Sequence, residues 1–129
     1  MAEKQVIRTE HAPGPFQGAP YNQAIHVGDL VFVAGQLGIK LGTGELAGPT
    51  VQEQTEQIMQ NLGAILEAAG SGLERLVKTT VFLIDLGDFA EMNEVYARHV
   101  GDAPPARSTV GISALPSGAR VEIEAVAHT

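Results

Sequence analysis

The sequence that decides the fold is Pro104-Pro105-Ala106-Arg107-Ser108-Thr109-Val110, followed further on by Val121-Glu122-Ile123-Glu124. Successive side chains of a β-strand point to opposite faces, so Arg107 and Thr109 share a face of the first run. Between the two runs, Leu115-Pro116-Ser117-Gly118 has the composition of a turn, because Pro fixes φ and Gly tolerates positive φ. The pattern predicts a β-hairpin made of two neighbouring strands.

The register of this hairpin is predicted by matching apolar residues across the two strands, since a slip of one residue would turn carboxylates into the core. In that register Arg107 and Thr109 share a sheet face with Glu122 and Glu124. One cation beside two carboxylates indicates a site for a small anion. A structural ion pair across the strands would account for the same residues, and from the pattern alone it is the simpler interpretation.

Length and composition indicate one globular domain over residues 1–129. A chain of 129 residues can bury a core, and 44% hydrophobic with 18% charged residues is typical of globular rather than disordered proteins. Its apolar runs are well short of the roughly 20 residues that span a bilayer, and no secretion signal is expected at its start. The absence of Cys excludes disulfides and thiolate nucleophiles, and it favours a cytoplasmic location.

The negative net charge limits the kinds of partner that the chain can bind. A net charge of −7 at pH 7 with eight scattered Lys and Arg residues makes polyanions poor partners, so we expect neither a nucleic acid nor a membrane. The four His residues lack metal-ligand spacing, and no metal site is predicted. Gly42-Thr43-Gly44 lacks the length and the Lys of a phosphate-binding loop.

Hydrophobic periodicity predicts the elements in the rest of the chain. Thr50 and Glu53 fit a capping box that begins a helix ending at Gly70, and a second helix runs from Asp88 to just before Gly101. The apolar stripe expected to be buried on the second helix is Phe89, Met92, Val95 and Tyr96. Further strands are expected at 5–8, 21–26, 30–37 and 76–84.

This order of elements predicts an α+β two-layer sandwich in which both helices cover one face of a sheet. Residues 30–37 and 77–84 are apolar on both faces, so the face without helices must also be covered. A symmetric homo-oligomer is the economical solution, and it would put a site on the polar face of the hairpin near a subunit boundary.

The chain resembles the Rid family, the reactive intermediate deaminases, over nearly its whole length. The residues that carry the resemblance are Ala19-Pro20-Tyr21-Asn22-Gln23, Ala34-Gly35-Gln36, Glu67-Ala68-Ala69-Gly70, Val77-Lys78-Thr79-Thr80-Val81-Phe82, Asp88-Phe89 with Asn93 and Tyr96, Pro105-Ala106-Arg107-Ser108 and Val121-Glu122-Ile123-Glu124-Ala125. The resemblance implies a mixed sheet of chorismate-mutase-like fold in a homotrimer with sites between subunits. It also implies hydrolysis of 2-imino acids, such as 2-iminobutanoate and 2-iminopropanoate, to 2-keto acids and ammonia, without a metal or cofactor.

The resemblance also implies roles for single residues. Arg107 matches the family Arg that binds the substrate carboxylate, a task suited to a permanently charged, bidentate fork. Glu122 matches the Glu that positions water for attack on the imine carbon. Tyr21 matches the Tyr that closes the pocket, Asn93 a helix residue near the site, and Gly35 a strand residue whose backbone lies close to the ligand.

Two positions depart from the family pattern: Pro104, where the family often has an aromatic residue, and Thr109. Many members have Cys where this chain has Thr109, and a hydroxyl does not easily replace a thiolate nucleophile. Thr109 in a substrate-binding site therefore implies water as the attacking group. Two other functions stay open from the sequence: a module that binds a small carboxylate without turnover, and a ribonuclease, which the acidic charge argues against.

Overall fold

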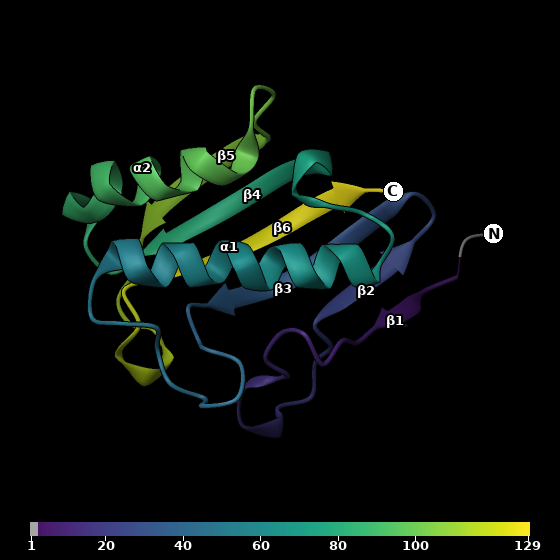
Figure 1. Ribbon diagram of the computed structural model, residues 1–129, viewed down its shortest axis with the longest axis horizontal. Helices are drawn as coiled ribbons and strands as arrows, with labels where there is room; N and C mark the ends of the chain where they lie inside the picture. Colours follow the sequence, from purple (N-terminus) through teal and green to yellow (C-terminus); the bar gives the residue numbers. More distant parts are fainter. Residues whose placement is uncertain (1–2) are drawn as a thin grey trace.

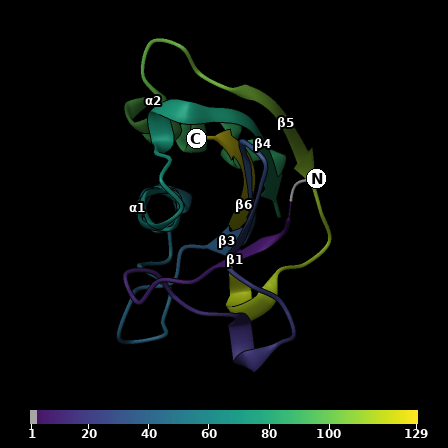
Figure 2. The same cartoon turned by 90° about the vertical axis from the view of Figure 1, so that its right-hand side faces the viewer.

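Two helices cover one face of a six-stranded sheet in the computed structural model of the chain, which describes residues 3–129 (Figure 1). The strands are β1 (Gln5–Ile7), β2 (Ala24–Val27), β3 (Leu30–Leu37), β4 (Leu76–Leu83), β5 (Ala106–Gly111) and β6 (Val121–His128). The helices are α1 (Val51–Ala68) and α2 (Phe89–Val100). Figure 2 shows both helices on the same side of the sheet, which confirms the predicted α+β two-layer sandwich.

The start and end of α1 are fixed by local chemistry. Thr50 Oγ1 accepts a hydrogen bond from the Glu53 backbone N–H at 3.1 Å, and the Glu53 carboxylate accepts one from the Thr50 N–H at 3.3 Å. The predicted capping box is therefore confirmed. The helix ends before Gly70, whose φ of +78° suits glycine. Its apolar stripe is fully buried against the sheet: Ile58, Met59, Leu62, Ile65 and Leu66.

Helix α2 buries Met92, Val95, Tyr96 and Val100. The prediction that Phe89 belongs to the buried stripe is wrong, because this side chain is 44% exposed. Phe89 is the first residue of the helix, and its ring lies near the Arg107 guanidinium on the edge strand β5.

The strand order β1-β2-β3-β6-β4-β5 overturns the predicted hairpin. Strand β4 lies between β5 and β6, antiparallel to β6 and parallel to β5. The intervening segment passes around the end of β4, where Ile112 N donates to Leu83 O and Ile84 N donates to Arg120 O. The apolar β4 gains burial as an interior strand, which outweighs the local pairing that the turn residues suggested.

The prediction that Arg107 and Glu122 share a sheet face is therefore also wrong. Residues in register on neighbouring strands share a face: Arg107 is level with Thr79, and Glu122 is level with Phe82. Thr79 and Phe82 are three residues apart on β4 and point to opposite faces. Thr79 is buried beneath α2, so Arg107 and Thr109 face the helices while Glu122 and Glu124 face away.

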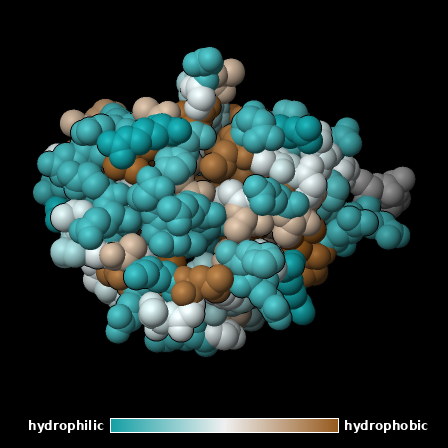
Figure 3. All heavy atoms as spheres, viewed as in Figure 1, coloured by the Kyte–Doolittle hydropathy of each residue, from teal (hydrophilic) through white to brown (hydrophobic). Residues whose placement is uncertain are grey.

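The sheet face without helices carries apolar side chains in one cross-strand row. Val6, Ile25, Phe32 and Val126 follow one another in register across β1, β2, β3 and β6, and Val6 and Phe32 are 46% and 44% exposed. The helix side, by contrast, is mostly hydrophilic (Figure 3). That a second copy of the chain covers the apolar row stays a prediction.

Within residues 3–129, no helix combines the length and apolar character that crossing a bilayer requires.

Candidate functional site

A cavity of about 430 Å³ lies where three connecting segments meet the ends of β3 and β6. These segments, around residues 13–21, 39 and 116, gather below the sheet in Figure 1. Three predicted site residues line the cavity together: Tyr21, Gly35 and Glu122. The apolar part of its wall comes from Pro13, Phe16, Ala19, Ala34, Leu37, Ile39 and Pro116. We call it the Glu122 cavity.

Gly35 lets the Glu122 side chain lie directly on the backbone of β3. The pairing of β3 with β6 shifts by one residue between Val33 and Gln36, the interval that contains Gly35. A Cβ atom at Gly35 would lie 2.8 Å from both Cδ and Oε1 of Glu122, a distance that real Cβ atoms do not show. Glycine therefore leaves room for the Glu122 carboxyl group in its present place, and any other residue would displace it. That the backbone of Gly35 lies next to a ligand stays a prediction.

The surroundings of Glu122 change its acidity. Burial raises the pKa of the Glu122 carboxyl above its ordinary value, and the negative charge of Glu124 raises it further. A carboxylate with a raised pKa accepts a proton more readily. Glu122 is therefore suited to act as a general base in the cavity.

The loop that closes the cavity is held by two side chains. The Tyr21 hydroxyl accepts a hydrogen bond of 2.6 Å from the Phe16 N–H. The buried amide of Gln23 accepts from the Thr9 N–H and donates to the carbonyls of Thr9, Ala12 and Pro13. Gln23 was not predicted as a site residue. Two sequence signals could have identified it: its place in the family motif at residues 19–23 and its position shortly after the Pro-rich loop that it holds.

Arg107, Thr109 and Asn93 do not line the Glu122 cavity. The Arg107 guanidinium lies 4.9 Å from the ring centroid of Tyr96 and 5.4 Å from that of Phe89, both on α2. It belongs to none of the ion pairs that link residues 3–129. Thr109 follows two positions later on the same strand face and is half-buried.

Asn93 lies on α2 between the two aromatic rings in sequence, four residues after Phe89 and three before Tyr96. Residues at this spacing share one helix face. Its buried Oδ1 atom finds no hydrogen-bond partner in the described part of the chain. Phe89, Asn93, Tyr96, Arg107 and Thr109 form what we call the Arg107 cluster. The contacts of the two rings with Arg107 were not predicted, because helical periodicity assigns both rings to the core.

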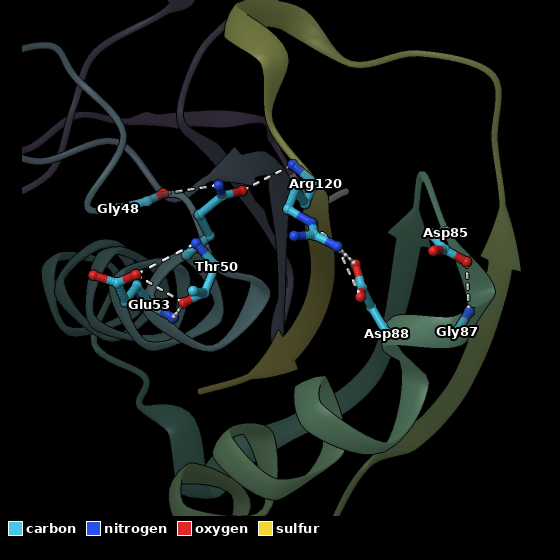
Figure 4. A network of polar contacts seen from close by, with 8 residues as sticks. Gly48, Thr50, Glu53, Asp85, Gly87, Asp88 and Arg120 are labelled. Carbon is cyan, nitrogen blue, oxygen red and sulfur yellow. Dashed lines mark hydrogen bonds and ion pairs between the residues drawn. The ribbon is translucent and has the colours of Figure 1, made fainter.

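A polar network fixes the segment that leads into β6 (Figure 4). The Arg120 guanidinium forms an ion pair of 2.9 Å with Asp88, and the Arg120 N–H donates to Gln54 Oε1 at 2.8 Å. The amide of Gln54 in turn donates to Gly48 O at 2.9 Å. Because Arg120 precedes Glu122 by two residues, this network supports one wall of the Glu122 cavity. Arg120 was not predicted as a site residue.

In the part of the chain that the structure describes, no three His, Asp or Glu side chains are grouped so that they could hold a metal ion.

A mixed sheet with two helices on one face, and a small cavity with a carboxylate in its wall, define a small-molecule-binding α+β protein. Residues 9–129 match the family model described as Endoribonuclease L-PSP. The chain belongs to this family, which is the Rid family indicated by its sequence motifs.

Three relatives illustrate the likeness. A RutC family protein of Pyrococcus horikoshii is 49% identical over 97% of this chain and 98% of its own length. The 2-iminobutanoate/2-iminopropanoate deaminase of Homo sapiens is 42% identical over 96% of this chain and 89% of its own. The crystal structure of E. coli TdcF with bound serine is 39% identical, covers 97% of this chain and 98% of its own, and superposes with a TM-score of 0.89.

Proposed function

We propose that the chain is a deaminase that hydrolyses 2-imino acids, such as 2-iminobutanoate and 2-iminopropanoate, to 2-keto acids and ammonia. The observation that carries this proposal is the Glu122 carboxylate in an apolar cavity, with its pKa raised by burial. The human relative is named for this activity, and the TdcF relative binds serine, a small molecule with a carboxylate and an amino group.

The reaction needs few protein groups. A protonated imine is already electrophilic at carbon, so the protein has to orient it and activate water. Glu122 accepts a proton from water while the oxygen bonds to the imine carbon. Transfer of that proton to nitrogen, loss of ammonia and deprotonation of the new hydroxyl yield the 2-keto acid. Thr109 in place of a Cys is consistent with water as the nucleophile.

The complete site takes side chains from two copies of the chain. Arg107 binds the substrate carboxylate and Glu122 activates water, yet the two side chains face opposite sides of one sheet. A single substrate reaches both groups when the Arg107 cluster of one copy meets the Glu122 cavity of another. A homotrimer with three such sites is our proposal, supported by the exposed apolar row on the sheet face that carries Glu122.

A ribonuclease is the second candidate, because the family model is described as an endoribonuclease. Its substrate is a polyanion, and the net charge of −7 opposes the approach of such a substrate. We therefore propose the imine as the substrate. A salt-independent failure to bind RNA would exclude the ribonuclease.

The test is the loss of 2-iminobutanoate generated in situ by threonine dehydratase, with semicarbazide reporting the imine that remains. Wild type is expected to accelerate this loss, and Arg107→Ala and Glu122→Gln are expected to abolish the acceleration. Saturable binding of 2-oxobutanoate without any acceleration would contradict the deaminase and favour a binding module. Acceleration retained in both variants would contradict the assignment of the site.

A further inference from the structure

The Arg107 guanidinium is held by aromatic rings instead of by a carboxylate. It contacts Tyr96, which is 5% exposed and fixed in the core, and Phe89, which is 44% exposed at the start of the same helix. The two residues are seven positions apart, two turns of α2, so their side chains project from one face toward β5.

This mode of support leaves the donors of Arg107 available. A guanidinium carries five N–H groups in its plane, and a carboxylate partner would occupy two of them in the usual bidentate geometry. Aromatic faces attract the cation without using its in-plane donors, and the Tyr96 hydroxyl, whose contact with Arg107 acts to lower the Tyr96 pKa, can accept at most one of the five. The cation is thus restrained in position but not neutralised.

The position of the Tyr96 ring is itself fixed from the sheet. Its hydroxyl shares a 2.7 Å hydrogen bond with the hydroxyl of Thr79, which is fully buried. Thr79 on β4 is paired in register with Arg107 on β5. The Tyr96 ring is therefore anchored to the strand that lies directly beside Arg107. Burial raises the pKa of the Tyr96 phenol above its ordinary value.

We propose that Phe89 and Tyr96 are positioning residues that restrain the Arg107 guanidinium while leaving its N–H groups free for the carboxylate of a 2-imino or 2-keto acid. This inference rests on the proposed function, since it takes Arg107 as the carboxylate anchor. Thr79 acts one step further away, by orienting the ring of Tyr96.

The experiment measures the Kd of 2-oxobutanoate by calorimetry, together with kcat and KM for the imine, in folded variants checked by their Tm. Phe89→Leu keeps an apolar side chain without a π face. Thr79→Val removes the hydrogen bond to Tyr96, and Tyr96→Phe removes that bond together with the contact between the hydroxyl and Arg107. Leu86→Ala is the matched control, because Leu86 is a 56% exposed apolar side chain close to Gly111 on the same strand as Arg107. Arg107→Ala tests whether Arg107 itself binds the carboxylate.

Phe89→Leu is expected to raise Kd and KM about 3- to 10-fold, within the range of one cation–π contact, with kcat changed less than about twofold. Tyr96→Phe and Thr79→Val are expected to show smaller increases, and Leu86→Ala none. If Phe89→Leu binds with the wild-type Kd while Arg107→Ala does not bind, the positioning role is overturned but Arg107 is still the group that binds the carboxylate. Wild-type Kd in Arg107→Ala, or no binding by wild type, would overturn the anchor and the positioning role together.

Discussion

Arg107 and Glu122 lie on strands separated by β4 and point to opposite faces of the same sheet. One small substrate cannot touch both side chains of a single copy, because the sheet itself stands between them. The relationship divides the candidate site into the Glu122 cavity and the Arg107 cluster. If both halves act on one substrate, activity requires an oligomer in which the Glu122 cavity of one copy meets the Arg107 cluster of another.

A mixing experiment tests this division. Arg107→Ala and Glu122→Gln are expected to be inactive alone, because each lacks one half of every site. Assembled together from denatured, equal amounts, they are expected to recover about a quarter of wild-type activity, the chance that a shared site draws both intact residues. Sites contained in one copy would recover nothing, so the absence of any recovery in correctly assembled mixed oligomers would contradict the shared site.

Gly35→Ala tests the close approach between β3 and Glu122. The added Cβ would lie 2.8 Å from the Glu122 carboxyl group and would push it from its place. We expect a roughly 10- to 100-fold loss of kcat/KM but only a small loss of stability, because the displaced atoms are the far end of a flexible side chain. Gly63→Ala on α1 is the control, since its Cβ meets only Leu73 at 3.4 Å, and its activity is expected to match wild type. Wild-type activity in Gly35→Ala would show that the carboxyl group can work from another position.

The ion pair between α1 and α2 predicts a pH dependence of stability. His99 Nε2 lies 2.9 Å from Glu56 Oε1, and this hydrogen bond is the main reason that the pKa of Glu56 lies below its ordinary value. The stability that Glu56 contributes is present above its unfolded pKa and is lost as pH falls through the lowered folded pKa. Because the pair is partly exposed, Glu56→Gln is expected to cost about 0.2–1 kcal/mol at neutral pH.

Urea unfolding of Glu56→Gln and wild type between pH 3 and pH 7 checks this prediction, and the difference is expected to shrink toward the acid end. Glu94→Gln serves as a control, because its pair with Arg98 is far more exposed, with side chains 70% and 61% accessible. A difference that grows as pH falls would contradict the role of the His99 contact.

The fold could be predicted from the sequence where local chemistry decides it. The capping box at Thr50 and the end of the helix before Gly70 follow from short-range patterns, and the structure confirms both. The neighbour of β5 could not be predicted in this way. Turn residues at 115–118 favour local pairing, whereas the insertion of β4 depends on burial of a strand some thirty residues away in sequence.

The site residues show the same limit. The family motifs identified Tyr21, Gly35 and Glu122, which the structure brings together in one cavity. Their separation from Arg107 depends on strand order, which alternation within one strand does not encode. The ring contacts of Phe89 and Tyr96 escaped prediction for a related reason: an aromatic residue on a helix stripe has the same pattern whether it packs on aliphatic side chains or on a cation.

Glu122→Gln is expected to lose activity and to be more stable than wild type at neutral pH. The folded pKa of Glu122 lies above the unfolded one, so above both values the ionised side chain makes the folded state less stable. The neutral amide removes this effect, and because solvent screens the half-buried carboxylate we expect a gain below about 1 kcal/mol at neutral pH, together with loss of deaminase activity. As pH falls through the raised folded pKa, wild type takes up the proton and the gain disappears, and below the ordinary value of 4.5 the two proteins are expected to unfold alike. Denaturant titrations at pH 4 and pH 7.5 measure both limits. A variant less stable than wild type at pH 7.5 would mean that the carboxylate forms a stabilising contact, and would remove the basis for its role as a base.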